Sequence, residues 1–501
     1  MASQVCNLPA CREQPAAPAL SRLPLWPSGV IPGLSGWLGW GIRGQMGHET
    51  GAMVPGSMIA LAAALTSPDP EIRRRAGLLG AVGAMAVSFG GTETYGQTLG
   101  LSHGDTREET YWWGLLGTAI KGGVWFGLGG TYLGMAAGDR DYSPLELLAL
   151  TAVETGLWHL GVELCNRPHE PPDKLPAIYF SDRHHLDDPA REPRPEVWGG
   201  QWLALLGLLG YVGAKCDRTA IILGGAGILG GAAGFTIGQA LQAWARHADL
   251  PPEWGRAIDY WKVMETTFGR VAGTALGLGL RLARAGQGPL SPRRPAPWWH
   301  NALGIAAAAV ALGAHLAEQP WTDEAMDAMV IAGTGIAGAF ASDTLAWLET
   351  LPLPYIYMVQ NTVAYFRQEA GLPQVAEGLV RVSIPVTAGL GGLAVALARM
   401  EGSDGGPAGI GLATQGWVHT LLTHVKMLTD RHTLGLDDPE PKALPPLGVV
   451  EQVVVRSATE KCPHSSLSQL VTQAAFTVAA AGLTGLVVWA WGKTGEAGGE
   501  G

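Results

Sequence analysis

Residues 89–99 read FGGTETYGQTL, and residues 231–241 read GAAGFTIGQAL. The second stretch restores the Thr, Gly, Gln and Leu of the first in the same order and at the same spacing. An apolar segment follows each stretch, and it repeats an aromatic pair, a threonine and a cation: Tyr111-Trp112, Thr118 and Lys121 first, then Tyr260-Trp261, Thr267 and Arg270. We interpret this as an internal duplication of about 145 residues.

The composition surrounding this repeat is typical of membrane helices. Charged residues make up 15% of the chain, and 72 of the 501 residues are glycine, about twice the usual fraction. Small residues allow helices to approach closely in a bilayer, where each helix must satisfy its own backbone. The sequence therefore predicts an all-α polytopic integral membrane bundle of about 11–13 transmembrane or re-entrant helices, with an internal repeat of same orientation.

The expected organisation follows the alternation of apolar spans and polar loops. In chain order we expect an N-terminal arm (1–25), a first membrane repeat (26–164), a polar loop (165–197), a second repeat (198–283), a basic linker (284–297), C-terminal membrane helices (298–428), a polar loop (429–466) and a last transmembrane helix (467–491).

Charge in the loops predicts the orientation. Basic residues fall in alternate loops, at 73–75, 140, 215–218 and 281–294, while the short loops between them are acidic. By the positive-inside rule the basic loops and the N-terminus lie in the cytoplasm, which makes this a multi-pass protein of the cell inner membrane. The lipid bilayer is thus an expected partner. A net charge of −10 gives no footprint for nucleic acid; the oligomeric state is left open.

Polar side chains within the repeated stretches are the first candidates for a site. Glu93, Thr94 and Gln97 have the spacing of one helix face, and the second copy repeats Thr236 and Gln239. They would bind a solute near the middle of the membrane, with Glu93 coupling an ion or proton. The alternative is ordinary hydrogen bonding between helices. Phe235 takes the place of Glu93 in the second copy, so such a site would be asymmetric in charge.

Lys121 and Arg270 are the cations at equivalent positions of the two copies. They could hold an anionic substrate, or they could pair with Glu93 and Glu265. Glu265, like Glu93, could couple an ion or proton. The other interpretation is a lysine that reaches the interface from a span end.

Two further groups are candidates. Arg43, Gln45, His48 and Glu49 stand between glycines and two apolar pieces, which is typical of a discontinuous membrane helix, or of a polar loop that joins two hairpin helices. His159 and Glu163 lie four residues apart on an apolar helix and could relay protons, unless they lie at a helix end near the interface.

The function that these patterns favour is a transporter or permease for a small polar or anionic solute or an ion. Matched polar positions in two copies favour transport over catalysis. One alternative is an intramembrane lipid- or glycan-modifying enzyme that uses His48/Glu49, His159/Glu163 or His419/His424; another is a non-catalytic scaffold. No nucleotide-binding or hydrolase motif occurs in the sequence, and we expect no cofactor and no metal site.

Overall fold

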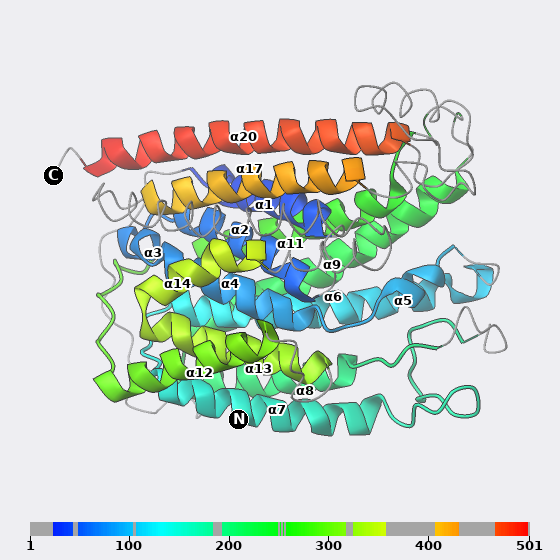
Figure 1. The fold of residues 1–501 in the computed structure, drawn as a ribbon, viewed down its shortest axis with the longest axis horizontal. Helices are drawn as coiled ribbons and strands as arrows, with labels where there is room; N and C mark the ends of the chain where they lie inside the picture. The colour runs from blue at the N-terminus through cyan, green and yellow to red at the C-terminus, as the bar shows by residue number, and fades with distance from the viewer. Residues whose placement is uncertain are drawn as a thin grey trace.

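The computed structural model describes residues 24–43, 49–103, 107–183, 193–248, 257–316, 324–356, 406–429 and 466–498, with the isolated positions 251 and 254 (Figure 1). Within these ranges every regular element is an α-helix, so the all-α prediction is confirmed. Two of the described helices are long and apolar enough to cross a membrane: α9 (Arg218–His247) and the part Leu470–Lys493 of α20 (Ser466–Gly498). Three shorter apolar helices accompany them, at Gly51–Leu65, Ala76–Gly90 and Ala328–Ala341.

The long helices lie side by side and run along the longest axis of the molecule (Figure 1). A central group packs in the order α6–α9–α11–α1–α2–α4, and α4 returns to α6. Its members are α1 (Trp26–Arg43), α2 (Glu49–Leu65), α4 (Ala76–Gly90), α6 (Arg107–Ala137), α9 and α11 (Tyr260–Arg284).

Glycine determines how closely these central helices approach. A Cβ atom added to Gly231 of α9 would lie 2.0 Å from the carbonyl oxygen of Gly122 on α6. The contact between α1 and α11 has the same form, because a Cβ on Gly269 would lie 2.0 Å from the carbonyl oxygen of Gly36. Both distances are shorter than van der Waals contact, so the backbones touch directly. This is the packing use of glycine that the composition indicated.

Further helices surround the central group. They are α7 (Pro144–Cys165), α8 (Trp198–Ala214), α12 (Trp298–Leu316), α13 (Glu324–Ala341), α14 (Asp343–Thr350), α17 (Gly406–Thr429) and α20. α7 starts at a capping box. The Ser143 side chain accepts from the backbone N–H of Glu146, and the Glu146 carboxylate accepts from the backbone N–H of Ser143.

The predicted basic loops gather at one end of the bundle, at the left in Figure 1, where α3 (Pro70–Arg74) lies. Arg75 donates to the carbonyl oxygens of Gly138 (2.9 Å) and Ser291 (2.9 Å), and Lys215 donates to that of Asp141 (3.1 Å). These bonds join four loops that are far apart in the sequence. The short helix α5 (Gly96–Gly100) and the described parts of the 166–197 loop, 166–183 and 193–197, lie at the opposite end.

The interpretation of residues 41–57 as a discontinuous helix is wrong. α1 ends at Arg43 and α2 starts at Glu49, and the two helices run antiparallel against each other. A Cβ on Gly39 would lie 2.7 Å from the Cα of Pro55, while the Ser28 hydroxyl reaches the carbonyl oxygen of Thr66 at 3.4 Å. The two helices form a hairpin, as the alternative interpretation of this stretch predicts.

The interrupted helix lies instead in the first of the two repeated stretches. α4 ends at Gly90, and α5 begins only at Gly96. The second stretch, 231–241, is an uninterrupted part of α9. The duplication itself stays a prediction; the two stretches have different local conformations.

Candidate functional site

A tryptophan from α6 packs against the break between α4 and α5. Trp125 donates its indole N–H to the carbonyl oxygen of Val87 at 2.7 Å, in the last turn of α4. Gly90 makes room for this ring, because a Cβ there would lie 2.1 Å from Trp125 Cδ1. A turn follows, in which the N–H of Gly91 donates to the carbonyl oxygen of Ser88 (2.8 Å). The chain therefore leaves the helix just before Glu93.

Lys121 projects from α6 into this break, and its ammonium group is surrounded by oxygen atoms. It lies 3.1 Å from Oε1 of Glu93 and 2.8 Å from Oε1 of Glu196. It also donates to the hydroxyl of Thr98 (2.9 Å) and to the carbonyl oxygen of Thr94 (2.5 Å). The predicted pairing of Lys121 with Glu93 is confirmed. We call Lys121, Glu93 and Glu196 the Lys121 group. The side chains of all three residues are fully buried.

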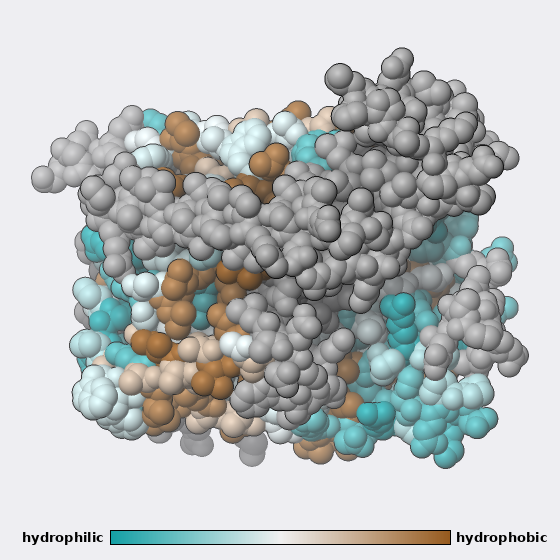
Figure 2. All heavy atoms as spheres, in the orientation of Figure 1, coloured by the Kyte–Doolittle hydropathy of each residue, from teal (hydrophilic) through white to brown (hydrophobic). Residues whose placement is uncertain are grey.

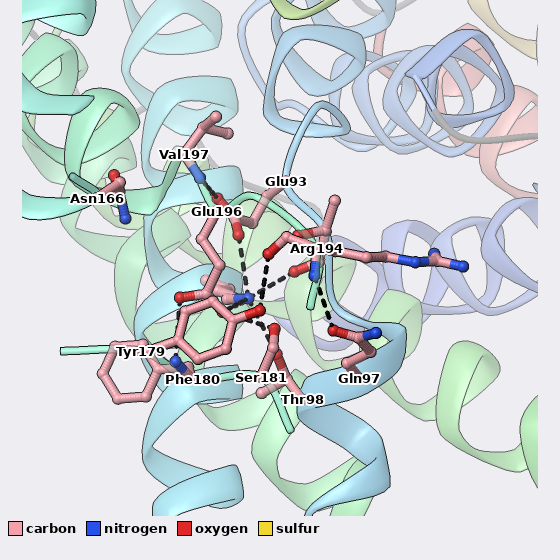
Figure 3. Close-up of polar contacts among 12 residues, drawn as sticks. Glu93, Gln97, Thr98, Asn166, Tyr179, Phe180, Ser181, Arg194, Glu196 and Val197 are labelled. Atoms are coloured by element: carbon pink, nitrogen blue, oxygen red, sulfur yellow. Dashed lines mark hydrogen bonds and ion pairs between the residues drawn. The ribbon is translucent and has the colours of Figure 1, made fainter. Parts of the chain in front are cut away.

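Glu196 comes from the end of the 166–197 loop, in a segment that we call the strap (residues 194–197). Four predicted site residues bind the strap, and two of them, Glu93 and Gln97, are labelled beside it in Figure 3. The Thr94 hydroxyl donates to Pro195 O (3.0 Å), Gln97 Oε1 accepts from Arg194 N (3.1 Å), Glu93 Oε2 accepts from Val197 N (3.3 Å) and Lys121 pairs with Glu196 (2.8 Å). The strap therefore closes over the helix break.

The rest of the loop fixes the Glu196 carboxylate. The Ser181 hydroxyl donates to Oε1 (2.8 Å), and the backbone N–H of Phe180 donates to Oε2 (3.0 Å). Burial, followed by the neighbouring Glu196 charge, raises the pKa of the Tyr179 phenol next to it. Breaking a buried ion pair by removal of one partner costs about 3–5 kcal/mol, so the three charges depend on one another.

The polar side chains of the second stretch join helices. Gln239 accepts from the Thr118 hydroxyl on α6 (2.6 Å) and donates to the carbonyl oxygen of Thr98 (3.2 Å). Thr236 reaches the carbonyl oxygen of Leu115 at 3.4 Å. These contacts have the form of interhelical hydrogen bonds, and through Thr98 they adjoin the Lys121 group.

Arg270 and Glu265 are not brought to this group. The Arg270 side chain is exposed, unlike its sequence counterpart Lys121. Glu265 is buried, and it pairs with Lys262 (2.6 Å) rather than with Arg270; the Trp261 indole also donates to it (2.9 Å). Lys262 also donates to the carbonyl oxygen of Gly41 at the end of α1 (3.0 Å).

Arg43 is buried at the end of α1 and donates to the Tyr95 hydroxyl. Its guanidinium carbon lies 5.4 Å from the ring centroids of both Tyr95 and Trp125, within cation–π range. Tyr95 belongs to the same break as Glu93, so Arg43 adjoins the Lys121 group. Gln45 and His48 lie outside the described residues, and only the backbone of Glu49 is described.

His159 and Glu163 lie on the outer face of α7. Both are exposed, and Glu163 faces Arg167 at 3.8 Å. The acid of α7 that points into the bundle is Glu154, which accepts from the Tyr132 hydroxyl.

Sequence reasoning missed Glu196 and Lys262. Glu196 stands in a Pro-rich polar loop, yet Val197 and Trp198 follow it at once, and an acid directly before an apolar span was the available signal. Lys262 and Glu265 have the three-residue spacing of a helical ion pair.

Among the described residues no three His, Cys, Asp or Glu side chains gather in a way that could hold a metal ion. The Lys121 group offers one ammonium and two carboxylates, which can bind a charged polar solute or exchange a proton. Comparisons with protein-family models, curated proteins and solved structures found nothing that matches this chain.

Proposed function

We propose that the chain is a multi-pass inner-membrane transporter or permease for a small polar solute with a carboxylate or similar anionic group. In this proposal the N-terminus is cytoplasmic, and the solute binds Lys121 at the helix break after the strap has moved away.

The outer surface supports the membrane part of this proposal. Large apolar side chains point outward from many of the described helices, and Leu229 on α9 and Val478 on α20 are 74% and 71% exposed. Further examples are Leu160, Leu206, Val310 and Leu421. Hydrophobic residues gather between the two ends on the visible face in Figure 2, and hydrophilic ones gather at the right-hand end. Exposed apolar surface of this kind indicates lipid contact. The basic loops gathered at the other end fit a cytoplasmic side.

The observation that carries the transport part is the shared partner of Thr94, Gln97 and Lys121. All three were predicted from the sequence to bind a solute, and all three bind the strap. Glu196 supplies a carboxylate to Lys121, so it occupies the place that the acid group of a solute would take. Movement of the strap releases three donors and acceptors at once. A solute carboxylate that replaces Glu196 keeps the charge balance of the site unchanged.

The test measures ligand-dependent unfolding midpoints and uptake into proteoliposomes for a panel of small carboxylates, phosphate, amino acids and sugars. A ligand at about 100 times its Kd adds about 2.7 kcal/mol to the stability of the folded protein. We expect Lys121→Met to abolish the ligand response and Glu196→Gln to strengthen it, since the competing carboxylate is weakened. Glu163→Gln, at an exposed position, is the matched control.

A purely structural ion pair makes a different prediction. Both variants would then lower the stability of the folded protein. The ligand response would not be lost in Lys121→Met and strengthened in Glu196→Gln. No response and no uptake across the whole panel would contradict the transport proposal.

A further inference from the structure

A second buried acid lies away from the Lys121 group. Glu154, on α7, is 4% exposed, and its Oε2 accepts from the hydroxyl of Tyr132 on α6. Its Oε1 has no hydrogen-bond partner among the described residues. The phenol of Tyr132 on α6 faces it, and Tyr211 on α8 lies on the other side of Tyr132 and donates to Glu146. α13 meets α7 one turn away at Gly333, which contacts Thr151, and α12 meets the far end of α7 at Pro144.

Glu154 therefore differs from the three buried acids described above. Glu93 and Glu196 share Lys121, and Glu265 has Lys262, whereas no ion pair joins Glu154 to a cation in the described part of the chain. An isolated carboxylate in an apolar interior is so costly that the group takes up a proton instead. One neutral donor such as Tyr132 does not offset that cost.

Two other buried polar atoms continue the line from Glu154 toward the strap. Trp158 lies one helical turn further along α7, at the four-residue spacing that puts side chains next to each other. Its indole N–H has no partner among the described residues, and neither has the side-chain oxygen of Gln201 on α8. The α7–α8 contact places Gly200, the residue before Gln201, against Trp158, since a Cβ on Gly200 would lie 2.9 Å from Trp158 Cδ1.

The chemistry of the three atoms is complementary. The N–H of Trp158 can only donate, the side-chain oxygen of Gln201 can only accept, and a protonated Glu154 oxygen can donate. A water molecule can accept two hydrogen bonds and donate to Gln201. Buried water typically makes about three hydrogen bonds of this kind to polar groups that lack a protein partner. The Gln201 amide already donates to Thr92 Oγ1 (2.8 Å), next to Glu93.

We propose that Glu154 is a proton-binding site in the bundle interior, and that buried water links it through Trp158 and Gln201 to the Lys121 group. In a transporter this proton would be the coupling ion, and that role rests on the proposed function. The proton site itself does not, because it can be observed without any solute.

The experiment is infrared spectroscopy of the full-length protein in lipid membranes at neutral pH. We expect a protonated-carboxyl C=O band that disappears in Glu154→Gln and shifts in frequency in Tyr132→Phe. The exposed Glu163→Gln is the matched control and leaves the band in place. If Glu154→Gln does not fold, the shift in Tyr132→Phe identifies the band. A spectrum in which neither variant changes any carboxyl band would overturn the proton site.

Exchange in deuterated water tests the link to the Lys121 group. We expect Gln201→Leu and Trp158→Phe to slow the deuteration of this band at least tenfold. Unchanged exchange in both variants would overturn the water link. Neither measurement involves a solute, so failure here is distinguishable from failure of the transport proposal.

Discussion

The stretch 89–99 and its echo 231–241 share four residues in register, yet one interrupts a helix and the other continues one. The main chemical difference is Glu93 against Phe235. Phe235 stacks on Phe268 of α11, with ring centroids 4.5 Å apart, and the helix stays intact around it. Glu93 needs a cation, and it meets Lys121 outside the helix. Two stretches of similar sequence thus have two structural roles, one for packing and one for charge.

The largest effect is expected from the two cations that the repeat makes equivalent. Lys121→Met leaves two carboxylates buried without their cation and should cost about 3–5 kcal/mol of unfolding free energy. Arg270→Met, at an exposed position, should change it by less than about 0.5 kcal/mol. Chemical or thermal unfolding in one detergent measures both variants.

A combined variant serves as the control for this pair. Lys121→Met with Glu93→Gln and Glu196→Gln removes all three charges and should recover a large part of the lost stability. Equal losses from Lys121→Met and Arg270→Met would contradict the contrast between the two stretches.

The two equivalent glycines should differ next. A Cβ on Gly238 would lie 2.6 Å from the carbonyl oxygen of Met264, whereas a Cβ on Gly96 meets nothing within 4 Å. Gly238→Ala should therefore cost about 1–3 kcal/mol, the usual range for overpacking. Gly96→Ala should be neutral or stabilise by up to about 1 kcal/mol, because alanine reduces the freedom of the unfolded chain. An equal loss of unfolding free energy in both variants would contradict the tight α9–α11 contact.

The smallest effect concerns His103, which follows the first stretch and lies near the end of the helix that contains the second. Burial, and then Arg246, His247 and Arg107, lower the pKa of His103 to about 4. The unfolded state therefore binds more protons than the folded state between about pH 6.5 and about pH 4. The stability that the neutral His103 ring permits is complete above about pH 6.5 and is lost as the pH falls toward about 4. The ring is partly exposed, and we expect a loss of about 1–2 kcal/mol. The pH dependence of unfolding in His103→Asn measures it; a native slope in that variant would contradict the assignment.

Much of the fold was predictable from local pattern. Apolar length and glycine content indicated close-packed helices, and loop charge indicated which loops share an end, because both signals act locally along the chain. Of the site, the Lys121–Glu93 pair was predictable, since a cation and an acid placed among apolar residues each need a partner.

The rest depended on contacts between distant parts of the chain. Glu196 is 75 residues from Lys121, and its place directly before an apolar span does not show that it reaches the Lys121 ammonium. Helix rotation was equally hidden. The even hydrophobicity of α7 did not show that Glu154 faces inward while His159 and Glu163 face outward.

The central claim is that the strap opens over Lys121, and Thr98 tests it most directly. Thr98 is fully buried and donates nothing to the strap, while its hydroxyl accepts from Lys121. Thr98→Cys would react with a water-soluble maleimide only in the opened state, so the rate of labelling above that of the native cysteines reports the open population. The account predicts labelling at least tenfold faster in Glu196→Gln than in the Glu196 background, equal to about 1.4 kcal/mol of lost closure. The same rate in both backgrounds would contradict it.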